Sequence, residues 1–279
     1  MTTMRRSLRH VWRRLRLVPR WLAALLMTGG LAATTLIVAQ LTQNWTILPT
    51  AVLAGSLAGP LAFGAWVADR TGAGRSVAPD VLVAMFIVGG GVAIIITGIF
   101  DHPFYSAPKG GGFLWISVVE ECSKVVVPLT VCMAIRSYRT VERVLALGIV
   151  SAAGFAVLES MAYTVSALDE SVKAARRVLF ERSLVVPFGH LPWTGIVVIV
   201  AATEWQARGR PTLTPRALWG LGAAIVLHTM WNLALVWQGW WYALVPVVAT
   251  VTFGLFYSLT RGVHYDGAYV APAARMPSG

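Results

Sequence analysis

The sequence predicts an all-α protein that crosses a membrane about eight times, and three observations support this prediction. Of its 279 residues, 57% are apolar and 13% are charged, whereas ordinary soluble domains have about 25% charged residues. The mean hydropathy is +0.68. The apolar residues gather in segments of about 20 residues, the length of a helix that spans a bilayer. We therefore expect a transmembrane helix bundle and no large soluble domain.

Two tails flank the predicted bundle, which covers residues 21–260. Residues 1–20 carry seven arginines and predict a cytosolic basic tail that could lie against anionic lipid. The first apolar segment, residues 21–41, has the alternative of a cleaved signal peptide, but it is too long and lacks a convincing small-residue cleavage site. Residues 261–279 predict a flexible tail.

Seven further apolar segments predict seven further spans, at residues 47–67, 81–100, 113–135, 144–168, 184–203, 217–236 and 240–259. With the amino terminus inside, the inner segments hold 17 Lys and Arg residues and the outer loops hold 5. Basic residues favour the cytosolic side, so this count predicts that both termini are cytosolic. The basic residues on the predicted cytosolic side account for the net charge of +11. The basic residues are not clustered on a soluble face with interleaved aromatics but lie in the amino-terminal tail and in short connections, so we expect no nucleic-acid partner.

The predicted outer loop at residues 169–183 departs from this charge pattern, because it holds four of the five outer basic residues. Its apolar residues Val172, Ala175, Val178 and Leu179 fall at helical spacing. One interpretation is an interfacial helix that lies over the bundle or gates access to it. A plain solvated connector is the other interpretation, and the sequence leaves both open.

The two cysteines, Cys122 and Cys132, both lie in the fourth predicted span. Ten residues on one helix separate them by about 15 Å, so they cannot form a disulfide with each other. We expect both to be buried apolar residues and not part of a cysteine metal site.

The fourth span also contains three charged residues, Glu120, Glu121 and Lys124. A charge near the middle of a bilayer costs about 2.5–3.5 kcal/mol on insertion scales, so such residues indicate a functional site. On a helix Lys124 follows Glu120 by four residues and Glu121 by three, which places all three close together. A structural ion pair is the simpler alternative, but packing does not require the second carboxylate.

The next two spans carry polar residues as well. The fifth span contains Phe155 and Glu159, four residues apart. The sixth contains His190 between Pro187 and Pro192, which predicts a bent or locally unwound helix. Such irregular backbone is tolerated in a membrane only against protein or a water-filled cavity.

In the seventh span His228 and Asn232 are four residues apart on one helix face. With alternating span directions, Glu120, Glu159, His190 and His228 all lean to the outer side of the bilayer centre. Hydrogen bonds between helices would explain any one of these residues. For the set, one shared site is the better explanation.

These residues have the chemistry that peptide hydrolysis by activated water requires. Two adjacent carboxylates repel one another, so the pKa of one is expected to rise, and a carboxylate that can take up a proton near neutral pH suits a general base. Histidines can polarise water, and an asparagine can donate to an oxyanion. Glu and His are also zinc ligands, so the cofactor is either absent or a single divalent metal such as zinc. The candidate metal ligands are Glu120, Glu159, His190 and His228.

The motifs EECSK, GFAVLES, RSLVVPFGHLPWTG and HTMWN occur in this order on successive predicted spans. In this order they resemble the PrsW family of intramembrane proteases, which is similar in layout to the group that includes the CaaX prenyl endopeptidases. The resemblance covers residues 113–235, which it identifies as the protease core. It implies an endopeptidase that is either a glutamate protease or a metalloprotease.

The resemblance also implies roles for the residues. Glu120 would be the general base, and Glu121 and Lys124 would tune its charge. Glu159 takes the place of a water-orienting histidine in the relatives, and Phe155 precedes it in the same motif. Ser160 departs from the family, in which asparagine is common at this position.

For the later spans, the resemblance implies that His190 and His228 polarise water or substrate and that Asn232 supports the oxyanion. It implies a single-pass membrane protein as substrate, similar to anti-sigma factors. The cut would lie on the outer side of a bacterial plasma membrane, in envelope stress signalling. Two functions of other classes stay open: a proton-coupled transporter or channel that uses the same residues as a relay, and a non-catalytic membrane scaffold.

Overall fold

The computed structural model of the protein describes residues 18–105, 110–185, 188–236 and 243–263. These residues form helices and short connections, with no strand among them, so the all-α prediction is confirmed. Nearly all of the predicted amino-terminal tail and residues 264–279 of the predicted carboxy-terminal tail lie outside the described residues.

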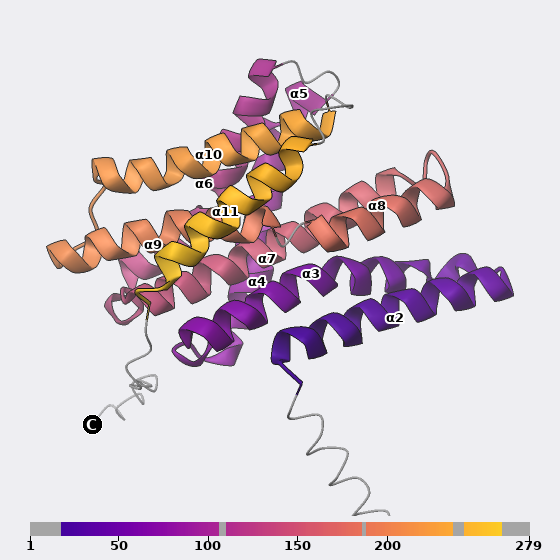
Figure 1. Cartoon of the computed structure of the whole chain (residues 1–279), viewed down its shortest axis with the longest axis horizontal. Coiled ribbons are helices and arrows are strands. Elements are labelled where there is room, and N and C mark those ends of the chain that lie inside the picture. Colours follow the sequence, from indigo (N-terminus) through magenta and orange to yellow (C-terminus); the bar gives the residue numbers. More distant parts are fainter. Residues whose placement is uncertain (1–17, 106–109, 186–187, 237–242, 264–279) are drawn as a thin grey trace, which may run out of the picture.

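The predicted spans correspond to eight long helices (Figure 1). They are α2 (Arg20–Thr42), α3 (Leu48–Thr71), α4 (Pro79–Phe100), α6 (Gly110–Ala134), α7 (Val141–Ser166), α9 (His190–Arg208), α10 (Pro215–Val236) and α11 (Leu244–Thr260). The helices α5 (His102–Tyr105) and α8 (Val172–Val185) lie between them.

Local sequence explains where several helices begin and end. Prolines occupy the first position of α4 and α10, where the missing N–H has no helical partner in any case. Gly72 and Gly209 follow α3 and α9 with φ of 72° and 67°, a left-handed conformation that glycine adopts without strain.

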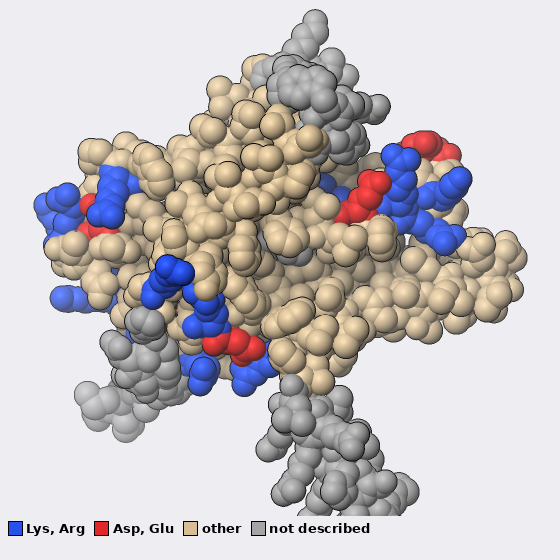
Figure 2. Space-filling view, viewed as in Figure 1, with Lys and Arg blue, Asp and Glu red and all other residues tan. Residues whose placement is uncertain are grey.

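The membrane character of the chain follows from these helices. Six apolar stretches in the described residues are long enough to cross a membrane; five correspond to α2, α3, α4, α7 and α10, and the sixth runs from α8 through α9. Helices α6 and α11 are not among these six stretches, because α6 carries the three charged residues and α11 has only 17 residues. The chain is thus a multi-pass membrane protein, while the count of eight spans stays a prediction. Figure 2 shows charged side chains gathered toward the ends of the helices, with a largely uncharged band between them.

Helix α7 lies at the centre of the bundle and contacts α3, α4, α6, α8 and α9. Its side chains and those of α9 are mostly buried, whereas α2 exposes Leu26, Ile37 and Leu41. This is the arrangement expected where lipid covers the outer helices. The functional residues on α6, α7, α9 and α10 are therefore held by the best-packed part of the molecule.

The predicted sixth span is wrong at its start. Residues 184 and 185 belong to α8, and α9 begins at His190. The helix break that the prolines predict is present, since Gly189 before α9 has φ −113° and ψ −106°. Pro192 is the third residue of α9, where its missing N–H breaks no helical bond. Pro187 itself lies outside the described residues.

The loop at residues 169–183 is largely helical, as one of its two interpretations expected. Helix α8 runs beside α7 (Figure 1), and Ala175 and Leu179 are buried against the bundle. It is therefore not a plain solvated connector. The cysteines are both free, and Cys132 is buried as expected while Cys122 is only half-buried.

Candidate active site

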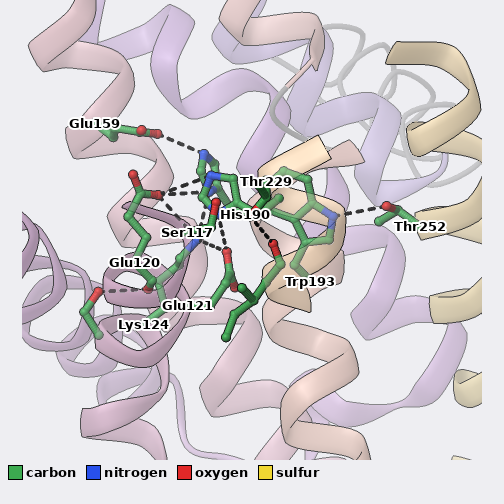
Figure 3. A network of polar contacts seen from close by, with 12 residues as sticks. Ser117, Glu120, Glu121, Lys124, Glu159, His190, Trp193, Thr229 and Thr252 are labelled. Carbon is green, nitrogen blue, oxygen red and sulfur yellow. Dashed lines mark hydrogen bonds and ion pairs between the residues drawn. The ribbon is translucent and has the colours of Figure 1, made fainter. Parts of the chain in front are cut away.

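Helix α6 brings Glu120, Glu121 and Lys124 into the interior, where Glu121 and Lys124 are fully buried. Lys124 Nζ lies 2.6 Å from Glu121 Oε1 and 3.8 Å from Glu120 Oε2. The i, i+3 and i, i+4 spacing predicted from the sequence thus produces a compact charged group (Figure 3). Burying such charges costs free energy unless they are paired, and Lys124 supplies the pairing.

Helix α10 adds His228, which lies against both carboxylates. Its Nδ1 is 2.8 Å from Glu121 Oε1, and its Nε2 is 3.7 Å from Glu120 Oε2. Because a carboxylate accepts hydrogen bonds, Nδ1 carries the proton and donates to Glu121. The Nε2 lone pair of His228 therefore faces Glu120.

The first residue of α9, His190, has the opposite assignment of its ring nitrogens. Its Nε2 donates to Glu159 Oε2 on α7 over 2.9 Å, and its Nδ1 accepts from Lys124 Nζ over 2.9 Å. His190 Nδ1 is also 3.8 Å from Glu120 Oε2. The Nδ1 lone pair of His190 thus faces the same carboxylate oxygen as His228 Nε2.

Three acceptor atoms therefore converge at the centre of the site: Glu120 Oε2, His190 Nδ1 and His228 Nε2. Glu120 Oε2 is buried and accepts no hydrogen bond from any described residue. The ligand atoms of the three residues all lie within 4.8 Å of one another. Lys124 Nζ donates to His190 Nδ1, whereas Glu120 Oε2 and His228 Nε2 face each other as acceptors. A water molecule or a cation between them would supply the missing partner.

The donor set fits a divalent metal in chemistry and approximately in spacing. Two ligands of a tetrahedral zinc lie about 3.3–3.5 Å apart, close to the 3.7 Å and 3.8 Å found here. Each histidine donates its other ring N–H to a carboxylate, the usual support of a metal-bound histidine. Of the four candidate ligands, Glu159 acts in this supporting position. Lys124 uses the lone pair of His190 Nδ1 and would have to release it.

Aromatic rings enclose the two histidines. Trp193 stacks on His228 with ring centroids 4.5 Å apart and donates from Nε1 to Thr252 Oγ1 over 3.1 Å. Phe155 contacts the edge of His190 with centroids 5.4 Å apart, and Lys124 Nζ lies 4.8 Å from its ring centre. These contacts fix the histidine rings and give Lys124 a further partner besides Glu120, Glu121 and His190.

Helix α8 contributes Arg182, which the sequence did not identify. Its Nη2 donates to Glu159 Oε2, and its Nε donates to Ser160 Oγ over 3.0 Å. Glu159 is thus held from two sides, by His190 and by Arg182. The residue that departs from the family pattern, Ser160, serves as an acceptor for this arginine.

A cleft of about 560 Å³ reaches the site between α8 and the α10–α11 pair. Buried residues of the site, His190 and Trp193, lie at its base, and Arg182 lines one wall. The cluster is consequently buried within the bundle, and His190 is the member of it that a molecule entering this cleft would meet first.

The structure brings together Glu120, Glu121, Lys124, Glu159, His190, His228 and Phe155. It leaves Asn232 aside: this residue is half-buried one turn beyond His228 on α10, and its side chain makes no hydrogen bond to a described residue. Trp193 and Arg182 were missed. Trp193 lies three residues after His190 on the same helix face, a spacing that could have identified it.

Asp101 was missed as well, although it directly follows the apolar segment that forms α4. It is fully buried, and neither carboxylate oxygen has a hydrogen-bond partner among the described residues. Burial raises its pKa from 3.8 to about 7, the negative charge of Glu159 adds to the rise, and Lys124 opposes it. An acidic residue at the end of an apolar segment usually indicates solvent, so the sequence did not point to this position.

The family model described as PrsW family intramembrane metalloprotease matches residues 78–258. The matched residues include every helix that contributes to the buried cluster. No curated protein and no solved structure gives a significant match to the chain. With its membrane-spanning helices and its buried Glu/His cluster, the chain belongs to the PrsW family of intramembrane metalloproteases and is a membrane-embedded protein hydrolase.

Proposed function

We propose that the buried cluster hydrolyses a peptide bond of a membrane-protein substrate by means of water activated at Glu120. The observation that carries this proposal is the convergence of Glu120 Oε2, His190 Nδ1 and His228 Nε2, with His190 lining an adjoining cleft. A water molecule in that space could donate to Glu120 Oε2 and to the Nε2 lone pair of His228, while Lys124 keeps the Nδ1 lone pair of His190.

The chemistry needs a base and, later, an acid at the same place. Glu120 would take a proton from water as the water oxygen attacks the carbonyl carbon of the scissile bond. The negative charge on the carbonyl oxygen would be stabilised by the nearby positive charge of Lys124. Glu120 would then give the proton to the leaving nitrogen as the C–N bond breaks.

The remaining residues would position these groups. Glu121 and Glu159 fix the ring nitrogens of His228 and His190, and thereby the direction of their lone pairs. Asn232 is a candidate oxyanion donor, because its amide has no partner among the described residues. That role would require the substrate carbonyl to lie toward α10.

A metal, if the protein carries one, would be held by Glu120, His190 and His228. It would polarise the attacking water and the substrate carbonyl. Lys124 would then stay with Glu121, whose Oε1 is its nearest acceptor at 2.6 Å. The protein residues would keep the same places in both cases, so the metal question is separate from the identity of the site.

The proposed substrate is a single-pass membrane protein, cut near the outer end of its membrane segment. The site lies in the first half of α6, the last third of α7, at the start of α9 and in the second half of α10. In the predicted topology all four positions are on the outer side. The family resemblance suggests anti-sigma-like substrates in a bacterial plasma membrane, and this remains part of the proposal.

A reporter cleavage assay in proteoliposomes tests the function. Wild type should cut a single-pass reporter, whereas Glu120→Gln and His228→Ala should lose nearly all cleavage, because the first removes the base and the second removes one of the converging acceptors. The variants should elute and melt as folded protein. Continued cutting by both variants would show that the chemistry occurs elsewhere.

The metal question has its own measurement. Wild type is treated with a strong chelator, its metal content is measured, and cleavage is followed again. Loss of cleavage that returns on adding one divalent metal supports a metalloprotease. Full activity in metal-free protein supports a glutamate protease.

A further inference from the structure

We propose that the cleft between α8 and the α10–α11 pair binds an extended apolar segment of the substrate, and that Arg182 positions the main chain of that segment. This inference rests on the proposed function, because it assumes that the cluster at the base of the cleft performs the hydrolysis. It assigns to α8 the role of one wall of the substrate site.

The cleft runs from the surface of the molecule to the catalytic cluster. At its base lie His190, Trp193 and Trp231, which are buried. Toward its mouth lie exposed side chains such as Tyr163 and Leu235, which are 45% and 40% exposed. A chain that enters at the mouth and reaches the base therefore meets the proposed water-activating residues.

The two walls of the cleft differ in polarity. Helix α8 contributes Glu181 and Arg182 beside Val178 and Val185, whereas the opposite wall is apolar and includes Leu235, Val245 and Pro246. A polypeptide in extended form has polar main-chain groups and side chains that alternate between two directions. Its apolar side chains can pack on the α10–α11 wall while its carbonyls approach the charged α8 wall.

Hydrolysis also favours an extended segment over a helix. In a helix each interior C=O accepts the N–H four residues further on, and the side chains surround the backbone. A transmembrane helix would therefore have to unwind locally before its peptide bond could be attacked at the base. Unwound main chain exposes the N–H and C=O groups that a charged wall can bind.

Arg182 is the residue of the α8 wall that is suited to hold such a chain. Two of its five N–H groups are accounted for by Glu159 and Ser160. Its guanidinium lies 4.5 Å from the ring centre of Tyr163, and its side chain is 21% exposed. The remaining donors are available for carbonyl oxygens of a chain in the cleft. The bond from Arg182 to Glu159, and from Glu159 to His190, links this contact to the catalytic cluster.

A lipid chain is the competing occupant of a membrane-facing cleft. The charged α8 wall disfavours it, because an acyl chain offers no acceptor to Arg182 and would leave the remaining guanidinium donors unpaired. The experiment below includes this occupant as an outcome.

Photo-crosslinking locates the substrate directly. A photoreactive phenylalanine analogue is placed at Val178 or Val245, which line the cleft, and at Phe180 as the control. Phe180 is on the same helix as Val178 but is 67% exposed and does not line the cleft. The background is Glu120→Gln, so that the reporter stays uncut, and each variant is checked by thermal unfolding.

We expect reporter adducts at residues 178 and 245 and not at 180. Equal adducts at all three positions, or lipid adducts alone at 178 and 245, would overturn the inference. The two proposals fail in different ways. If wild type does not cut the reporter, the proposed function fails; if it cuts but the cleft positions do not crosslink, only this inference fails.

The role of Arg182 is tested by separating KM from kcat. Arg182→Lys keeps a positive charge for Glu159 but loses the planar set of donors. We expect KM to rise about tenfold, the equivalent of about 1.4 kcal/mol, with kcat nearly unchanged. The matched control is Arg177→Lys on the exposed side of α8, which should change neither constant. A variant that loses thermal stability and kcat while keeping KM would show that Arg182 is only structural.

Discussion

Lys124 lies completely buried, 2.6 Å from Glu121 and 3.8 Å from Glu120. Moving a charged side chain from water into the protein interior costs free energy, and this cost is offset only while an opposite charge lies beside it. Removing one partner of a buried pair typically costs about 3–5 kcal/mol, because the other charge is left uncompensated. Exposed pairs contribute only about 0–1 kcal/mol.

The variant Lys124→Met should therefore unfold at a markedly lower temperature than wild type, with a loss of about 3–5 kcal/mol. The control is Arg177→Met, which breaks the exposed pair with Glu181 and should change stability by less than about 1 kcal/mol. Adding Glu121→Gln to Lys124→Met should recover part of the loss, because one of the two unpaired carboxylates is gone. Thermal unfolding of the detergent-purified proteins measures all three, and equal melting of Lys124→Met and wild type would contradict this account.

Asp101 presents the converse case, a buried carboxyl group without a partner among the described residues. Its pKa is raised to about 7, so the folded protein binds this proton more tightly than the unfolded chain does. Between about pH 4 and pH 7 the folded state binds more protons, and stability falls as pH rises. Above pH 7 the full cost of the buried charge is present.

The variant Asp101→Asn should thus melt at a higher temperature than wild type at pH 8, and the gain should shrink as the pH is lowered toward 4. Melting curves across that range measure it. The exposed Asp80→Asn at the other end of α4 should give no gain at any pH. A gain from Asp101→Asn that is constant across the range would mean that the charge of Asp101 is not its cause.

At the scale of the elements, the contact between α4 and α7 decides where Glu159 lies. Gly90 of α4 meets Gly154 of α7, and a Cβ added at Gly90 would lie 2.6 Å from Gly154 Cα and from the backbone nitrogen of Phe155. Backbone atoms cannot move aside as side chains can, so the two helices would have to separate. Glu159 is five residues further along α7 and would move with it.

The neighbouring glycine provides a matched control. Gly90→Ala should destabilise the protein by about 1–3 kcal/mol, the range for overpacking, and should lower reporter cleavage as well. Gly91→Ala, one residue away, meets nothing within 4 Å, and alanine favours helix over glycine. Gly91→Ala should be neutral or slightly stabilising. Comparable losses in the two variants would contradict the close α4–α7 contact.

Local pattern predicted a large part of this arrangement. The spacing of Glu120, Glu121 and Lys124 on one helix placed them together, and alternating span directions placed Glu159, His190 and His228 at the same depth. The prolines around His190 predicted the break before α9. Each of these features depends on neighbours in sequence or on a simple periodicity.

The features that sequence reasoning missed depend on tertiary packing. Arg182 reaches Glu159 only because α8 folds back along α7. The spacing of apolar residues in α8 predicts a helix, but it does not predict against which helix α8 packs. Asp101 follows an apolar segment, a position where solvent is the usual expectation. Its burial results from the elements packed around the end of α4.

At the scale of the whole molecule, the distribution of charge implies an orientation. Lys and Arg dominate the predicted inner segments, 17 against 5, and the exposed basic residues of α8 are the main exception. The inner connection between α9 and α10 contains Arg208 and Arg210. If basic residues mark the cytosolic side, this connection is inside and α8 is outside. The cleft then opens on the outer half of the membrane, where the proposed cut lies.

Cysteine labelling in intact cells tests this orientation. Lys173→Cys on α8 and Arg210→Cys after α9 both replace exposed residues, so a thiol at either place can react if reagent reaches it. A membrane-impermeant maleimide should label Lys173→Cys in intact cells and Arg210→Cys only after the membrane is opened. The unsubstituted chain, whose Cys132 is buried and Cys122 half-buried, gives the background. Labelling of Arg210→Cys in intact cells, with Lys173→Cys protected, would reverse the topology and place the cleft and its cut on the cytosolic side.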